Sequence, residues 1–285
     1  MAVTSLAEVS QQIQHFWAPV FSKQLRENLL LGSLVNKEYQ GEIKAMGDQV
    51  KVSQVNAPTG QLLTVGTDAD SFSSEAISTS YVDIVANKRA VASYEFQDLV
   101  SIQSMIDGKS QEVMSALNFA VAKQINSYLY SLVSPSTSSP DHSIAGVSDF
   151  NASQLAACRI LAAQAKWGMD KPWYALLDPQ YYGDVLNAST MTSSDYVGAE
   201  TPAVSGQIAK QRFGFSIFED NSRSADYGLL FHPDFMHLVM QQDIQVKVSD
   251  LHSQKKFGYV MSVDCIFGAA LGINGNVKHI KVYNT

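Results

Sequence analysis

The 285-residue sequence has little charge, because Asp, Glu, Lys and Arg supply 16% of it, against about 25% in ordinary soluble domains. Serine, in contrast, supplies 34 residues. A surface poor in charge and rich in small polar side chains favours a protein that hides much of its outside against copies of itself, since interface cores are depleted in Lys, Glu and Asp. The formal net charge of −7 argues against a dedicated nucleic-acid binder, which needs a basic face.

Cysteine is also scarce. Cys158 and Cys265 are far apart in apolar contexts, which predicts two buried free thiols, no disulfide and a reducing cytoplasm as the place of synthesis. No apolar run approaches the roughly 18 to 20 residues of a membrane span. The first residues lack the basic region of a secretory signal. We therefore expect no membrane partner.

Catalytic motifs are missing as well. The sequence has no Gly-x-Ser-x-Gly elbow, no phosphate loop and no Cys-rich cluster, so we expect no enzyme, no metal and no cofactor. His232 and His237 lack the Glu of a zinc-protease helix, which favours capping or solvent-exposed histidines. Gly272 to Gly275 follow an apolar strand without a third glycine or a helix, which predicts a hairpin turn instead of a dinucleotide site.

The longest stretch with one apolar helical face covers residues 110–133. Its apolar residues recur every four positions, and they are Val113, Leu117, Val121, Ile125 and Leu129. This pattern predicts a helix of roughly 36 Å, which we call the spine helix. Periodicity alone is equally satisfied by the core helix of any α+β domain. We expect the stripe to be core and not interface.

Two segments before the spine helix cannot bury their own apolar residues. Residues 1–47 contain short helical arcs broken by Pro19 and Gly32, which predicts an arm lying on the body or on a neighbouring copy. Residues 48–87 contain two strands of period two, joined by a long linker of Gly, Ser, Thr and Asp. We interpret them as an extended hairpin, which must rest on a partner surface because an isolated hairpin is marginal in water.

The hairpin linker carries the residues for which we predict contacts between subunits. They are the apolar anchors Leu62, Leu63, Val65 and Phe72, and the acids Asp68, Asp70 and Glu75. Since residues 52–87 hold a fourth acid and no base, the facing surface is expected to be basic. The candidates for that surface are Lys109, Lys123, Lys247, Lys255 and Lys256. The acids lack the turn glycine of a calcium loop, so we expect no ion site.

The remaining patterns alternate between helix and strand and predict an α+β fold. Helices are predicted at 98–106, at 148–167, from Asp178 as N-cap, and at 233–241 after His232-Pro233. Strands are predicted at 172–177, 212–220, 228–232, 243–250, 257–271 and 277–284, and the last three are expected to close one sheet.

The order of these elements resembles the major capsid proteins of tailed bacteriophages, which share the Hong Kong 97 fold with encapsulins. Residues 19–52 resemble that family's arm and first hairpin strand, and residues 94–130 its short helix and spine helix. Residues 173–186 and 228–241 are similar to two strand-helix units of the domain near the capsomer axis. The resemblance covers nearly the whole chain and lies in the order of the pieces.

This resemblance implies a subunit with five parts. They are an N-terminal arm (1–47), an extended hairpin loop (48–87), a peripheral domain with the spine helix (88–140), an axial domain (141–235), and a peripheral sheet with the C-terminal strands (236–285). Some family members join Lys to Asn through the hairpin loop. Residues 52–87 contain no Lys, which argues against such crosslinks here.

The implied function is a structural one. Hexamers and pentamers of the chain would form the icosahedral head of a tailed double-stranded DNA phage, assembled in the host cytoplasm and retained in the virion. Scaffolding and portal proteins would be partners, and DNA would be contacted weakly and non-specifically. The alternatives are an encapsulin-like shell around cargo enzymes, which shares the fold, and a solitary α+β enzyme.

Overall fold

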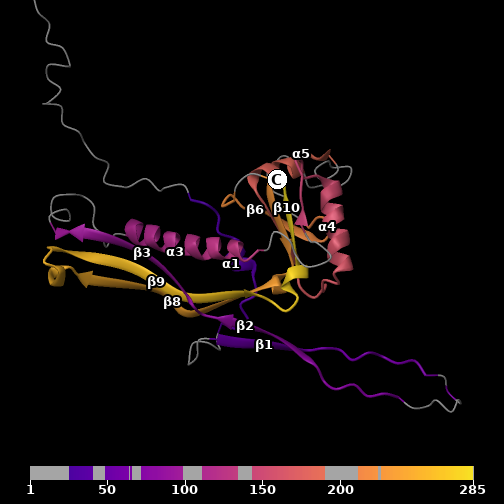
Figure 1. The fold of residues 1–285 in the computed structure, drawn as a ribbon. Helices are drawn as coiled ribbons and strands as arrows, with labels where there is room; N and C mark the ends of the chain where they lie inside the picture. Colours follow the sequence, from indigo (N-terminus) through magenta and orange to yellow (C-terminus); the bar gives the residue numbers. More distant parts are fainter. Residues whose placement is uncertain are drawn as a thin grey trace, which may run out of the picture.

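The computed structural model describes residues 26–40, 49–63, 65, 72–98, 111–133, 143–189, 211–223 and 226–284. These residues form helices together with sheets of two, three and five strands, which is the predicted α+β class. The spine helix lies along the three-stranded sheet, and the five-stranded sheet with its helices stands at one end of it (Figure 1). The two-stranded hairpin starts on the side of the three-stranded sheet that faces away from the spine helix, and it projects from there below the five-stranded sheet (Figure 1).

The spine helix, α3, runs over Gln111–Ser131, as predicted. Its buried residues include Leu117, Val121, Ile125 and Leu129, all less than a tenth exposed. They pack against the three-stranded sheet, whose order is β3 (Lys88–Gln97), β9 (Gly258–Leu271) and β8 (Met236–Asp250). Burying each such side chain contributes roughly 1.5–3 kcal/mol. The stripe is therefore core, as the period of four predicted.

The five-stranded sheet has the order β4–β10–β7–β5–β6. Its strands are β4 Ser143–Ile144, β10 His279–Tyr283, β7 Tyr227–Phe231, β5 Trp173–Leu177 and β6 Phe215–Glu219. Helices α4 (Ala152–Gln164) and α5 (Pro179–Asn187) pack against this sheet. Together they form a second hydrophobic core, distinct from the core that contains the spine helix.

The predicted cap of α5 is present and has a second role. The buried Asp178 carboxylate accepts the backbone N–H groups of Gln180 and Tyr181 at the start of the helix, and those of Asp226 and Tyr227 at the start of β7. It therefore fastens α5 to the neighbouring strand, because four N–H donors depend on one side chain.

The predicted helix at 233–241 is wrong. Pro233–Phe235 form one 3₁₀ turn (η3), and the chain then continues as β8. The residues from Met236 to Val239 are buried on both faces, because Met236 and Leu238 lie in the core that contains α3 whereas Val239 packs on the other face against the hairpin strands. Their two edges are paired with β9 and with the N-terminal segment, where Leu238 N–H donates to Asn36 C=O. A strand buried on both faces has no alternation, so its sequence is easily mistaken for a helix.

The three C-terminal strands do not close one sheet. β8 and β9 pair with each other, whereas β10 pairs with β7 and β4 in the five-stranded sheet. Gly272 to Gly275 therefore lie in a link between two sheets, with a 3₁₀ turn (η5, Gly275–Val277), and do not form a hairpin turn. A Cβ at Gly272 or Gly275 would lie 2.5 or 2.4 Å from a carbonyl oxygen of η3, so this close approach requires glycine.

The described part of the N-terminal segment lies on the body of its own chain. Helix α1 (Leu31–Leu34) places Leu31, with Val35 just after it, in the core cluster that contains the spine helix. Residues 1–25 lie outside the described residues. The same holds for the helix predicted at 98–106, of which only residue 98 is described.

Both cysteines are buried and free, which confirms the prediction, and burial raises the pKa of Cys158 to about 12. None of the helices in the described ranges is long and apolar enough to cross a membrane.

Candidate intersubunit surfaces

The hairpin is longer than its two strands. β1 (Gln49–Val55) pairs antiparallel with β2 (Thr79–Val85), and side chains then continue the same register outward. The hydrogen-bonded pairs beyond the strands are Asn56 with Ser78, through backbone and side-chain bonds, and Thr59 with Glu75 and Gln61 with Ser73, through side-chain bonds. Side-chain bonds thus hold the two segments together where they lead away from the body (Figure 1).

The outer part of this hairpin exposes large apolar side chains. Leu62 is fully exposed, Val65 and Phe72 are 92% and 77% exposed, and Leu63 is 41% exposed. Ile77, which was not among the predicted anchors, is 84% exposed as well. A projecting segment with several exposed apolar side chains is typical of a surface that another molecule covers.

The predicted acids of the hairpin are only partly described. Glu75 is exposed, and its carboxylate accepts the Thr59 N–H at 3.1 Å. Asp68 and Asp70 lie outside the described residues. The interaction of all seven predicted contact residues with a neighbour stays a prediction.

The root of the hairpin is fixed to the body by tight packing. Val50 and Val52 of β1 form a small core with Ile84, Ala86 and Val239. At the crossing with β9, a Cβ added to Gly268 would lie 2.2 Å from Val85 C=O and 2.8 Å from Ala86 Cα. Only glycine lets the two backbones approach so closely. The hairpin therefore has a fixed root and an exposed end.

The predicted basic surface is largely occupied by the chain's own acids. Lys123 lies 2.6 Å from Glu27, Lys247 lies 3.0 Å from Asp264, and Lys256 lies 2.9 Å from Glu95. Lys255 is exposed, and Lys109 lies outside the described residues. Residue type alone could not reveal these ion pairs, because each joins residues far apart in sequence.

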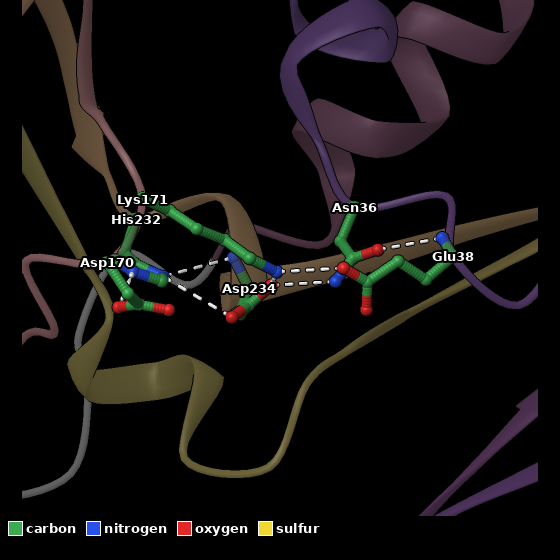
Figure 2. A network of polar contacts seen from close by, with 6 residues as sticks. All are labelled: Asn36, Glu38, Asp170, Lys171, His232 and Asp234. Carbon is green, nitrogen blue, oxygen red and sulfur yellow. Dashed lines mark hydrogen bonds and ion pairs between the residues drawn. The ribbon is translucent and has the colours of Figure 1, made fainter.

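A polar network joins the N-terminal segment to Lys171, which lies just before β5, and to Asp234 in η3, as Figure 2 shows. Lys171 Nζ donates to Glu38 Oε1 at 3.0 Å and to Asp234 Oδ1 at 2.9 Å, and Asn36 Nδ2 donates to the same Asp234 oxygen at 2.7 Å. Burial raises the pKa of Asp234, but the Lys171 and Asn36 hydrogen bonds outweigh it and hold that pKa below its usual value. Lys171 therefore connects three segments by charge.

The two predicted surface histidines are buried. His232 caps η3, since its Nδ1 accepts Asp234 N–H at 3.2 Å, which confirms capping. His237 is neither a cap nor solvent-exposed, and it packs edge-on against Tyr39 with ring centroids 5.3 Å apart. Burial is the main cause that lowers the pKa of both imidazoles. Within the described ranges, no three His, Cys, Asp or Glu side chains gather to hold a metal ion.

Comparison with solved structures identifies this architecture. A structure from Mycobacterium phage Che8 matches with a TM-score of 0.77 at 19% identity, over 94% of this chain and 96% of that one. The capsid structure of Cyanophage P-SCSP1u matches with a TM-score of 0.74 at 16% identity, over 96% and 94%. The mature capsid of bacteriophage PhiM1 matches with a TM-score of 0.68 at 12% identity, over 95% and 91%. The chain has the Hong Kong 97 fold.

In sequence, no family model and no curated protein matches the chain.

Proposed function

We propose that the chain is the major capsid protein of a tailed double-stranded DNA phage and self-assembles into the icosahedral head. The observation that carries this proposal is the match to phage capsid structures over nearly the full length of both chains. A partial match would leave room for an added domain with another role. Here almost every residue belongs to the shared fold.

The exposed hairpin supports assembly independently of the comparisons. An isolated two-stranded ribbon with fully exposed Leu62 and 77% exposed Phe72 gains nothing from projecting into water. It becomes favourable when a neighbouring copy covers it. We therefore assign Leu62, Leu63, Val65, Asp68, Asp70, Phe72 and Glu75 to contacts between subunits.

We propose the predicted division of the subunit into arm, hairpin loop, peripheral unit and axial unit, with one adjustment. We assign β10 to the axial unit, because it pairs with β7 and β4. Hexamers and pentamers would place axial units around their symmetry axes. We assign the chain no catalytic role.

The partners follow from a phage head. Scaffolding and portal proteins would assist assembly in the host cytoplasm, and the shell would remain in the virion. The chain's charge of −7 favours weak, non-specific contact with packaged DNA. Portal, terminase and scaffolding genes beside the coding gene would distinguish a phage head from an encapsulin-like compartment.

Sedimentation of the purified chain tests the proposal. We expect particles far larger than the 31.1 kDa subunit, alone or with a scaffolding protein. A variant in which a short Gly-Ser turn replaces residues 57–77 should fold, yet remain a small species, because it lacks the docking loop. A wild-type chain that stays monomeric under all assembly conditions would contradict the proposal.

A further inference from the structure

Two cations lie together on the face of the five-stranded sheet that turns toward α3. Arg223, in the link between β6 and β7, has its guanidinium carbon 4.6 Å from the Tyr130 ring centroid and 4.8 Å from that of Tyr227. Lys281 Nζ in β10 lies 5.6 Å from the Tyr227 centroid and 4.7 Å from that of Tyr283. Both cations therefore share the Tyr227 ring, in cation–π geometry.

The strand register explains why they meet. Tyr283 stands opposite Tyr227 in the β10–β7 pair, and Lys281 is two residues earlier, so all three side chains lie on one face. Tyr130 reaches the same place from the end of α3, where its hydroxyl donates to the buried Asp220 carboxylate. The three tyrosine rings therefore line one side of the two charged groups.

No carboxylate of the described chain lies within ion-pair distance of either cation. Asp220 accepts the Tyr130 hydroxyl and Ser222 N–H, and Asp226 accepts an Asn284 amide N–H. Arg223 Nε is buried without a hydrogen-bond partner. Burial, and after it the nearby Arg223 charge, lower the pKa of Lys281. This differs from Lys123, Lys171, Lys247 and Lys256, each of which lies within 3.0 Å of a carboxylate.

We propose that Arg223 and Lys281 form the receptor for the acidic hairpin of a second copy, with the Glu75 carboxylate as their partner. This inference rests on the proposed shell function and adds the docking site. Residues 52–87 carry four acids and no base. Among them, Asp83 is held by Lys51 at 3.7 Å, whereas the exposed Glu75 carboxylate contacts one backbone N–H.

The contact must join two copies. In Figure 1 the outer part of the hairpin projects below the body and apart from the five-stranded sheet, so we assign the contact with Lys281 to the hairpin of a second copy. Each copy would donate its hairpin to one neighbour and accept that of another, which is the head-to-tail contact that closes rings. The planar guanidinium of Arg223 can donate two hydrogen bonds to a carboxylate, and the tyrosine rings shield the ion pair with Glu75 from water on one side.

Carbodiimide treatment of assembled particles gives a direct test, since it joins a carboxylate and an amine only when they touch. It activates the carboxyl, and the lysine amine displaces a urea to leave an amide. We expect a peptide that links Glu75 to Lys281 between subunits. A link from Glu75 to Lys255, with none to Lys281, would overturn the inference in favour of the predicted basic surface at the β8–β9 turn.

A charge exchange gives the second test. Glu75→Lys and Lys281→Glu should each lower the yield of particles several-fold, and the double variant should restore it. The matched control is Lys166→Gln, which removes an exposed positive charge just after α4 and should assemble like wild type. Circular dichroism melting of each unassembled variant separates a folding defect from an assembly defect.

Other outcomes would overturn the inference. Single variants that assemble normally but retain less DNA would identify a phosphate as the partner of Arg223 and Lys281. Normal assembly and normal DNA content in every single variant would show that the two cations bind no partner. If wild-type protein forms particles in these cases, the shell proposal stands while the receptor fails. If wild type forms none, both fail.

Discussion

Replacement of Lys171 by Met should destabilise the unassembled subunit by about 1–2 kcal/mol. A hydrogen bond to a charged group contributes roughly 1.5–3 kcal/mol, and the pair with Asp234 is discounted because its side chains are 32% and 24% exposed. The pair with Glu38, which is 61% exposed, adds about 0–1 kcal/mol at most. The variant leaves Asp234 with the Asn36 amide as its side-chain donor.

Lys256→Met is the matched control. Lys256 lies 2.9 Å from Glu95, the same distance as Lys171 from Asp234, but the two side chains are 57% and 47% exposed. Exposed pairs at this distance contribute little, so we expect a loss below about 0.5 kcal/mol. Urea unfolding at pH 7, followed by the fluorescence of the buried Trp167 and Trp173, measures both losses. Equal losses of unfolding free energy in the two variants, or no loss in Lys171→Met, would refute the claim that burial makes the Lys171–Asp234 pair stronger than the Lys256–Glu95 pair.

The pH dependence of the Lys171 effect has a defined sign. The pKa of Asp234 is held below its ordinary value, so its contribution is complete above the usual carboxyl pKa of about 4 and is lost as the pH falls through the folded-state pKa. The pKa of Lys171 is raised by Asp234, so its contribution persists until the pH rises above about 10. The difference between wild type and Lys171→Met should therefore be constant from about pH 5 to 9 and shrink in acid.

Three further predictions concern the core, the hairpin root and the cap. Leu117→Asp should abolish soluble expression, because burying an unpaired carboxylate costs several kcal/mol; a soluble, folded variant that merely failed to assemble would place the stripe at an interface. Gly268→Val should displace the hairpin root and speed proteolysis of the hairpin, whereas Gly60→Ala, whose Cβ meets no atom within 4 Å, should not; equal protease sensitivity in the two would count against close packing at β9. Asp178→Ala should cost about 2–4 kcal/mol, since four N–H groups lose their acceptor and those of Tyr181 and Tyr227 are buried; a melting temperature equal to wild type would contradict this.

The sequence patterns predicted those elements whose period is local. The spine helix, the two strands of the hairpin and the Asp178 cap each have a pattern set by residues within a few positions of each other, and each was found where expected. β8 was missed at its start because burial on both faces removes the alternation that identifies a strand. The pairing of β10 with β7 was missed because adjacency in sequence favoured β9.

On the candidate intersubunit surfaces, too, only the features that depend on local sequence could be predicted. The exposed anchors of the hairpin, such as Leu62 and Phe72, could be predicted because apolar residues in a long polar linker have no local core to enter. The charge partners could not. Whether a lysine is free depends on acids brought near by the fold, as Glu27 is to Lys123, and the Arg223–Lys281 pair arises from a strand register that no local pattern encodes.

Electron microscopy of the purified chain after assembly, alone and with a scaffolding partner, tests the central claim most directly. We expect closed icosahedral shells of uniform size, with density for a hairpin from one subunit lying on its neighbour. Individual subunits of 31.1 kDa, or irregular aggregates without symmetry, under every assembly condition would contradict it.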